Sequence, residues 1–234
     1  NQHMRFHPTA KAMREAVASG KLGDVYLTDV RWMRSAGIPG YGSWFTRKDL
    51  AGAGALFDIG VHMLDLGLWV LGFPKVERVV GRVSGFLGAQ GLGLGGWGTD
   101  RGDARFDVDD TAVATLSLEG GGTFRMHVAW AAFASEDERV TFLGTKGGAD
   151  RSALLYGASE PLRFFAPDGP DRIVGTPFAF DGDGGQWHEG VKAFVRAVRG
   201  EEKLIVPPEE PLAVLRLLEA IVASSDTDSE IVLA

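Results

Sequence analysis

Apolar residues follow a helical period most densely between Gly52 and Gly72, and this stretch predicts one buried helix. At 100° per residue, apolar side chains cover most of its circumference, as in a helix packed inside a protein. Gly72 and the nearby Pro74 are typical of a helix C-terminus. One narrow polar stripe remains, formed by Asp58, His62, Asp65 and Trp69. Its charged groups require water, partners or a cleft, because burying an unpaired charge is costly.

The polar stripe has two main interpretations. It is either a solvent-facing stripe with a satisfied histidine, or a catalytic face on which Asp58 and His62, one turn apart, act together. A third interpretation is a metal site formed by Asp58, His62 and Asp65. The metal site is less favoured, because one histidine with two acids is a poorly selective ligand set.

Strict alternation of apolar and polar residues predicts an antiparallel hairpin over residues 110–119 and 123–130, turned by three glycines. Its polar face carries Thr115, Ser117, Arg125 and His127. Further strands are predicted at residues 25–34, 76–86, 139–143, 149–152, 154–156, 162–165, 172–174 and 230–233, and helices at 8–19, 186–199 and 209–225. This order predicts an α+β fold: a large, mostly antiparallel open sheet with helices on one face. No clear linker divides residues 1–234, so one domain is expected.

The segment from Gly91 to Gly96 matches the G-x-G-x-x-G pattern of dinucleotide-binding loops. That motif requires a strand that turns into a helix whose amino-terminus holds the pyrophosphate. The following residues, Trp97 to Gly102, have no helical pattern, and no ribose-binding acid follows at the usual distance. The segment therefore predicts a flexible loop.

Composition excludes several classes of function. The formal net charge of −7 and the lack of a Lys/Arg-rich run argue against nucleic acid or an anionic membrane as a partner. The chain has no cysteine, which excludes thiol catalysis, disulfides and cysteine-ligated metal sites and fits a cytoplasmic location. No uninterrupted apolar run reaches the roughly 18 residues of a membrane span.

Residues 35–48 form a Gly/Pro-containing loop rich in aromatic and cationic side chains, among them Tyr41 and Trp44. Such a loop can form the rim of a sugar-binding site, or its aromatics can simply pin it to the protein. The sequence leaves both interpretations open.

Several stretches together resemble the glucose–fructose oxidoreductase/inositol dehydrogenase/rhizopine-catabolism (Gfo/Idh/MocA) family. The strongest is AGALFDIGVHMLD at residues 53–65, with its D-x-G-x-H-x-x-D element; the others are NQHMRFHP at 1–8, GKLG at 20–23, WF at 44–45, GTKG at 144–147 and the pattern over 211–233. The resemblance covers essentially the whole chain, but it involves only the carboxy-terminal domain of that family.

The resemblance implies an NAD(P)-binding Rossmann domain, with a glycine-rich phosphate loop and an active-site lysine in an E-K-P element, ahead of this region. Neither motif occurs in the sequence. The chain is therefore expected to be a fragment carrying the substrate-binding, catalytic and oligomerisation domain. Its cofactor would be NAD or NADP, bound mainly by the missing domain, and the fragment alone is expected to be inactive.

The resemblance also implies a reaction, in which hydride passes between nicotinamide and a hydroxyl or carbonyl carbon of a sugar or cyclitol. His62 would be the general acid/base, and Asp58 would orient it or bind a substrate hydroxyl. The candidate substrate-binding residues are Arg5, His7, Arg34, Tyr41, Trp44 and Asp65, with a structural hydrogen bond favoured for Asp65. The alternative is a non-enzymatic sheet module for assembly or ligand sensing.

Members of that family often pair through the open face of the sheet. A homo-oligomer is therefore expected, with the polar hairpin face at Thr115, Ser117, Arg125 and His127 as the suspected contact.

Overall fold

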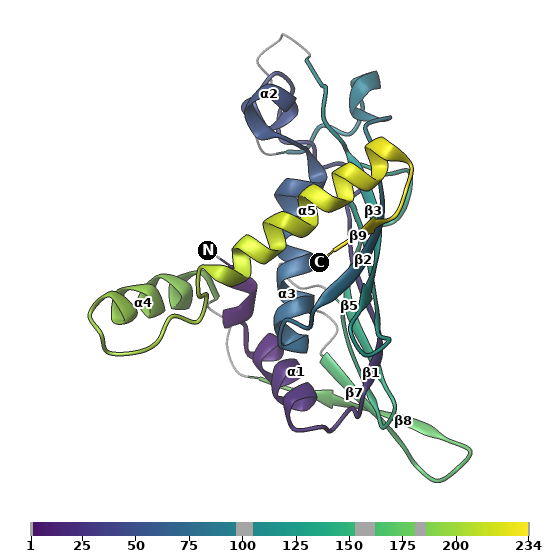
Figure 1. The fold of residues 1–234 in the computed structure, drawn as a ribbon, viewed down its shortest axis with the longest axis vertical. Helices are drawn as coiled ribbons and strands as arrows, with labels where there is room; N and C mark the ends of the chain where they lie inside the picture. Colours follow the sequence, from purple (N-terminus) through teal and green to yellow (C-terminus); the bar gives the residue numbers. More distant parts are fainter. Residues whose placement is uncertain (1, 97–104, 153–161, 181–185, 234) are drawn as a thin grey trace.

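The computed structural model describes residues 2–96, 105–152, 162–180 and 186–233 (Figure 1). Within these residues the strands form one nine-stranded sheet in the order β8-β7-β6-β5-β1-β4-β3-β2-β9. The strands are β1 Val25–Met33, β2 Val76–Ser84, β3 Thr111–Leu118, β4 Thr123–Ala129, β5 Asp137–Gly144, β6 Gly148–Ser152, β7 Leu162–Pro167, β8 Ile173–Phe178 and β9 Ile231–Val232. Neighbouring strands pair antiparallel except β1 and β4, which pair in parallel.

The helices lie on one side of this sheet, and its other face is open (Figure 1). The longer helices are α1 Pro8–Ala18, α3 Val61–Leu71, α4 Gln186–Val198 and α5 Glu209–Thr227; the short ones are η1 His3–Phe6, η2 Trp44–Thr46, α2 Lys48–Ala51, η3 Leu56–Gly60 and η4 Gly88–Gln90. The predicted α+β class, with a mostly antiparallel open sheet and helices on one face, is confirmed.

The central helix differs from its prediction at its start. The short helix α2 ends at Gly52, whose φ of 80° suits glycine. After a turn, the chain enters a π-helical segment, η3, which continues directly into α3 and ends at Gly72 in the left-handed conformation. Because a π turn holds more residues than an α turn, a wheel drawn at 100° per residue does not describe the first turn.

The central helix is a core element. Residues 48–71 are long and apolar enough to span a membrane by length and composition alone, but 72% of their most apolar 18-residue stretch is buried inside the protein. Helix α3 approaches the sheet closely, because a Cβ at Gly67 would lie 2.5 Å from the Phe124 ring on β4. Glycine at this position lets the helix backbone pack directly on the strand.

The predicted alternation in the hairpin is confirmed. Ala112, Ala114, Leu116 and Leu118 of β3, and Phe124, Met126 and Val128 of β4, are buried under the helices. On the open face Arg125 and Thr115 are exposed, and His127 and Ser117 are half-buried. The sheet therefore has one apolar, helix-covered face and one polar, uncovered face.

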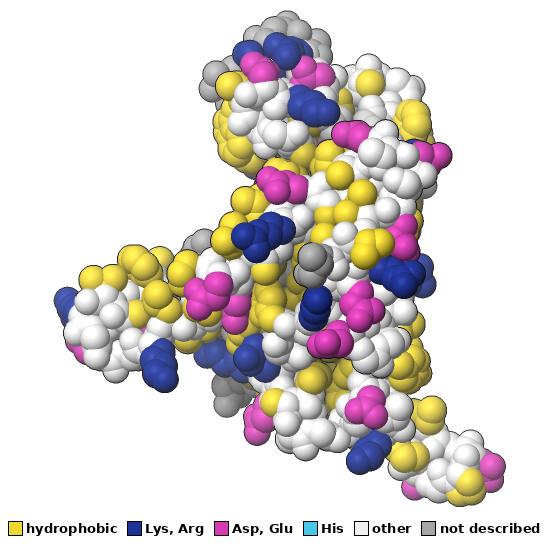
Figure 2. Space-filling model, viewed as in Figure 1, with side chains coloured by type: hydrophobic (Ala, Val, Ile, Leu, Met, Phe, Trp, Pro, Cys, Tyr) yellow, Lys and Arg dark blue, Asp and Glu magenta, His cyan; other side chains and the backbone are white. Residues whose placement is uncertain are grey.

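Helix α4 projects from the body of the molecule (Figure 1), and apolar side chains gather on this projection (Figure 2). Its predicted apolar side is largely exposed: Val191 60%, Phe194 61%, Val195 40% and Val198 70%. The amphipathic pattern thus predicts the helix correctly, but within the described residues this apolar side does not pack into the core.

The segment Gly91–Gly96 is not a dinucleotide-binding turn. It follows η4, Gly91 and Gly93 have positive φ values, and Leu94 forms an isolated parallel bridge with Ile38. The predicted loop is confirmed over these residues. Residues 97–102 and the strand expected at 154–156 lie outside the described residues.

Candidate active site

The start of the central helix is held by a buried carboxylate. Asp109 accepts hydrogen bonds from the backbone N–H groups of Gly54 at 2.7 Å and Leu56 at 2.8 Å. Its own carbonyl accepts from the N–H of Ala55 at 3.0 Å. A Cβ at Gly54 would lie 1.9 Å from that carbonyl oxygen, so only glycine fits there. These contacts fix the point at which the π segment begins, and hence the direction of its side chains.

Asp58 lies in this π segment, a type of distortion that is frequent at functional sites. Its Oδ2 accepts a hydrogen bond of 2.8 Å from the indole Nε1 of Trp130, a residue with no exposed surface just beyond the end of β4. Burial raises the pKa of Asp58 above its usual value, whereas the Trp130 hydrogen bond and the charge of Arg34 oppose this shift. The carboxyl group is therefore held in one orientation in a partly dry environment.

His62 follows one turn later in α3 and is partly buried. Its ring meets the ring of His3 edge-on, with centroids 4.9 Å apart, and lies 6.5 Å from the Trp32 ring. Burial, reinforced by His3 and the charge of Arg34, lowers the pKa of His62 to about 4. At neutral pH the imidazole is uncharged, so it can accept a proton.

Arg34 brings a cation to the same region. Its guanidinium carbon lies 4.5 Å from the centre of the Trp32 ring, and its charge affects the pKa values of both Asp58 and His62. Nη1 of Arg34 and Nδ1 of His62 are buried and have no hydrogen-bond partner among the described residues. The site thus combines a carboxylate, a neutral imidazole and a guanidinium with unused hydrogen-bonding capacity.

A family model for the GFO/IDH/MocA C-terminal domain matches residues 10–150, which is more than half of the chain. The chain belongs to this family. Over 231 residues it is 30% identical to D-glucoside 3-dehydrogenase of Escherichia coli K12, covering 98% of this chain but 62% of that relative. The chain therefore spans less than two thirds of the length of this relative.

Solved structures show the same fold as this GFO/IDH/MocA domain. An oxidoreductase domain protein from Kribbella flavida superimposes with a TM-score of 0.81 and 22% identity, over the whole of this chain and 64% of its own. Levoglucosan dehydrogenase in complex with NADH and L-sorbose superimposes with a TM-score of 0.80 and 18% identity, over the whole of this chain and 65% of its own.

Two of the candidate substrate-binding residues of the GFO/IDH/MocA domain, Arg5 and Asp65, form a buried ion pair. Arg5 donates from Nε to Oδ2 of Asp65 at 2.8 Å and from Nη2 to Oδ1 at 2.5 Å, and both side chains have at most 1% exposure. Nη1 of Arg5 also contacts Glu210 and the carbonyl of Ile205. This network joins η1, α3 and α5, so it supports a structural role for both residues, as favoured for Asp65.

His7 has a structural contact of its own. It is the N-cap of α1, and its Nδ1 accepts a hydrogen bond from the N–H of Thr9 at 3.2 Å. Its Nε2 lies 3.4 Å from Nη2 of Arg151. Burial and the charge of Arg151 lower the pKa of His7 to about 4. A substrate contact for His7 stays a prediction without a supporting contact in the structure.

Tyr41 and Trp44 lie in the predicted aromatic loop. The hydroxyl of Tyr41 donates to the carbonyl of Leu92 at 2.6 Å, and its side chain is buried. Trp44 stacks on Phe45 with centroids 3.8 Å apart and is 54% exposed. Among the described residues, no hydrogen bond or ring contact joins either residue to Asp58 or His62. Arg34, unlike these two residues, acts through its charge on the candidate catalytic residues Asp58 and His62.

Sequence reasoning missed three residues that shape the site of this GFO/IDH/MocA domain: Trp130, Asp109 and His3. In the sequence, Trp130 has the pattern of an ordinary core residue of a strand, and its hydrogen-bond partner Asp58 is 72 positions away in the chain. His3 lies within a stretch that carried the resemblance, but nothing in its local pattern distinguishes it. The metal interpretation gains no support, because Asp65 pairs with Arg5 and no metal-binding group was found among the described residues.

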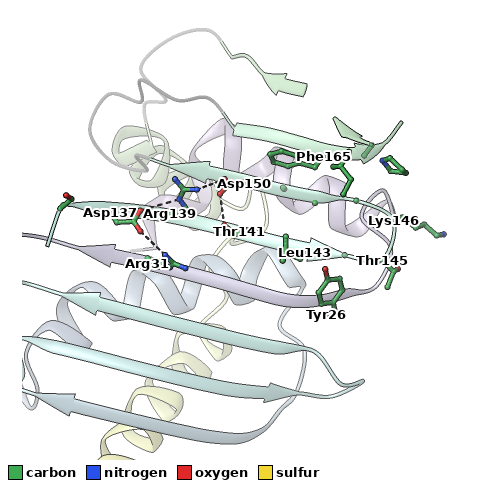
Figure 3. A pocket seen from close by; sticks show the side chains of 18 of the residues that line it. Tyr26, Arg31, Asp137, Arg139, Thr141, Leu143, Thr145, Lys146, Asp150 and Phe165 are labelled. Carbon is green, nitrogen blue, oxygen red and sulfur yellow. Dashed lines mark hydrogen bonds and ion pairs between the residues drawn. The ribbon is translucent and has the colours of Figure 1, made fainter. Parts of the chain in front are cut away.

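A cavity of about 1030 Å³ lies away from this site on the open face of the sheet (Figure 3). It is lined by Arg31, Asp137, Arg139, Thr141 and Asp150, with Tyr26 and Phe165 at one end. Asp58 and His62 belong to the helices of the opposite face. Neither Asp58 nor His62 lines this cavity, so it is separate from the candidate catalytic residues.

Proposed function

We propose that this chain provides the substrate-binding and acid–base side of an NAD(P)-dependent oxidoreductase that acts on a hydroxyl or carbonyl carbon of a sugar or cyclitol. The observation that carries the proposal is the uncharged imidazole of His62, one turn after an Asp58 carboxyl that Trp130 holds in place. The relationship to D-glucoside 3-dehydrogenase supports the reaction class.

The chemistry follows from what the oxidation of an alcohol requires. The carbon loses a hydride while its hydroxyl loses a proton, so a base must lie beside the oxygen. The neutral His62 accepts that proton, and in the reverse direction it returns the proton to the carbonyl oxygen. Arg34 places a positive charge near Asp58 and His62, which stabilises negative charge developing on the oxygen.

The described residues of this chain do not fit the pyrophosphate of a dinucleotide. The one glycine-rich match, Gly91–Gly96, is a loop that bridges to Ile38, and no helix begins within its described part. We propose that NAD or NADP binds mainly to residues outside this chain, and that the dinucleotide, when bound, supplies the hydride acceptor.

The test is turnover in the complete protein, with methyl glucosides and inositols offered together with NAD⁺ or NADP⁺. Replacement His62→Asn should lower kcat by about 10²–10⁴-fold, which is the usual contribution of a general base. Replacement His188→Asn is the matched control, because His188 is exposed on α4. Normal turnover in an Asp58→Asn/His62→Ala double variant would instead favour the non-enzymatic sheet module.

We also propose that the open face of the sheet binds a second copy of this chain. The polar hairpin face with Arg125 and His127, and the neighbouring cavity in Figure 3, remain uncovered by the described residues. Sedimentation equilibrium should show an oligomer, and Arg125→Glu should weaken it by reversing a charge next to Asp29. A wild-type protein that is monomeric at high concentration contradicts this proposal.

A further inference from the structure

Three aromatic rings from three different elements form a row that ends at the candidate base. His62 of α3 meets His3 of η1 edge-on at 4.9 Å, and His3 stacks on Trp187 of α4 at 5.1 Å with an interplanar angle of 16°. Trp187 is 47% exposed, whereas His3 is 9% exposed. This ring row of His62, His3 and Trp187 leads from the base toward the exposed side of α4.

The ring row contains polar atoms that the described residues leave without a partner. Nε2 of His3 and Nδ1 of His62 are both buried, and neither has a hydrogen-bond partner in the described part of the chain. Nη1 of Arg34 is also buried and has no hydrogen-bond partner among the described residues. The ring of Trp32 contacts both Arg34 and His62 and so connects the two residues. Buried polar groups are nearly always hydrogen-bonded, so a group of orphaned atoms needs an explanation.

The chemistry of these atoms indicates which ligand would satisfy them. Burial lowers the pKa of both His3 and His62, so each ring is neutral and offers one donor and one acceptor. A hydroxyl group also donates and accepts, and it can therefore pair with either nitrogen. The charges of Asp58 and Arg34 offset each other, so the region favours an uncharged ligand over a carboxylate or a phosphate.

Building on the function proposed above, we propose that His3 binds a hydroxyl group of the substrate adjacent to the one that His62 deprotonates, and that the group bound here is an uncharged polyhydroxylated ring. Trp187 is a positioning residue, because its stacked indole fixes the plane of the His3 ring. Specificity among sugars then depends on a contact from η1 as well as on the central helix.

The kinetic test uses His3→Phe, which keeps an aromatic ring between His62 and Trp187 but removes both nitrogens. With a methyl glucoside that the complete protein oxidises, KM should rise roughly tenfold or more while kcat changes much less, as expected for lost binding. The variant should also lose the ability of the wild type to discriminate against the monodeoxy analogue that lacks the bound hydroxyl. His188→Phe on the exposed part of α4 is the matched control and should leave KM unchanged.

A second readout does not depend on turnover. In ¹⁵N NMR of the histidine rings, methyl β-D-glucopyranoside should shift the Nε2 resonance of His3, and glucose 6-phosphate at the same concentration should shift it less. Unchanged KM and discrimination in His3→Phe, while His62→Asn is inactive, would overturn this inference and leave the proposed function standing. Absence of any shift at His3 would overturn it whatever the turnover result.

Discussion

The indole Nε1 of Trp130 donates a 2.8 Å hydrogen bond to Oδ2 of Asp58, and this bond connects the end of β4 to the π segment of the central helix. Trp130 has no exposed surface, so the sheet fixes its position. The carboxylate of Asp109, which accepts hydrogen bonds from the backbone N–H groups of Gly54 and Leu56, fixes the start of the same segment. The orientation of the Asp58 carboxyl group is thus determined by residues on both sides of it.

Replacement Trp130→Phe should raise the pKa of Asp58 further. The indole hydrogen bond favours the ionised carboxylate, and its loss leaves the effect of burial less opposed. Hydrogen bonds to charged groups contribute roughly 1.5–3 kcal/mol, which corresponds to a shift of about 1–2 pH units. The shift can be measured by NMR titration of the Asp58 side-chain carboxyl carbon.

Phe124→Leu is the matched control for this variant. Phe124 lies on β4, the strand that leads to Trp130, and is equally buried, and its replacement loosens packing without removing a hydrogen-bond donor. A pKa shift of the same size in both variants would mean that Asp58 responds to general loosening, and not to the indole N–H.

Much of the fold could be predicted from the sequence because its signals are local. The alternation of apolar and polar residues in β3 and β4 identifies the buried face of the sheet, and Gly72 identifies the end of the central helix. Both signals lie within a few consecutive residues, so they can be read from the sequence alone. The parallel pairing of β1 with β4 could not be predicted, because about 100 residues separate the two strands and no hairpin constrains their register.

The candidate site could be predicted only in part. Asp58 and His62 stand out because they are polar residues on an otherwise apolar helix. The partners that position them, Trp130 and His3, come from distant segments, and their local patterns suggest only burial. The ion pair between Arg5 and Asp65 could not be predicted for the same reason, because 60 positions separate the two residues in the chain.

Stability should fall when the pH drops from about 6.5 toward 4. The pKa values of His7 and His62 are about 4 in the folded protein and about 6.5 in the unfolded chain, so between these values the unfolded state binds more protons. The folded state therefore reaches its full stability with respect to these two histidines above about pH 6.5, and it loses stability as the pH falls toward 4. For the buried His7 it amounts to up to about 3 kcal/mol. Urea unfolding at pH 7 and at pH 5 measures the difference.

His7→Asn identifies the contribution of this residue. Asparagine is a good N-cap and can accept the hydrogen bond from Thr9, but it does not titrate in this range. The variant should lose less stability than the wild type between pH 7 and pH 5. His188→Asn, at an exposed position, should keep the wild-type dependence. An identical pH dependence in His7→Asn and the wild type would show that His7 is not a source of the effect.

Replacement Gly54→Ala should displace the start of the central helix. The new Cβ would lie 1.9 Å from the carbonyl oxygen of Asp109, and a backbone atom cannot move aside without breaking the contacts that hold the π segment. We expect a loss of about 2 kcal/mol or more in the free energy of unfolding and a large fall in turnover. Gly96→Ala is the control, since among the described residues no heavy atom beyond its chain neighbours lies within 4 Å of its new Cβ. Equal stability of the two variants contradicts the assigned role of Gly54.

Replacement Asp65→Ala should destabilise the protein strongly, because it leaves the fully buried Arg5 without its bidentate partner. Removing one member of a buried ion pair typically costs about 3–5 kcal/mol. Arg78 and Glu230 form an exposed pair, so Glu230→Ala should change stability by less than about 1 kcal/mol. Adding Arg5→Met to Asp65→Ala removes the buried charge that would keep only Glu210 as an acidic partner, and it should recover part of the loss in urea unfolding. If Asp65→Ala instead keeps wild-type stability and raises KM for the sugar, Asp65 contacts the substrate and the structural assignment fails.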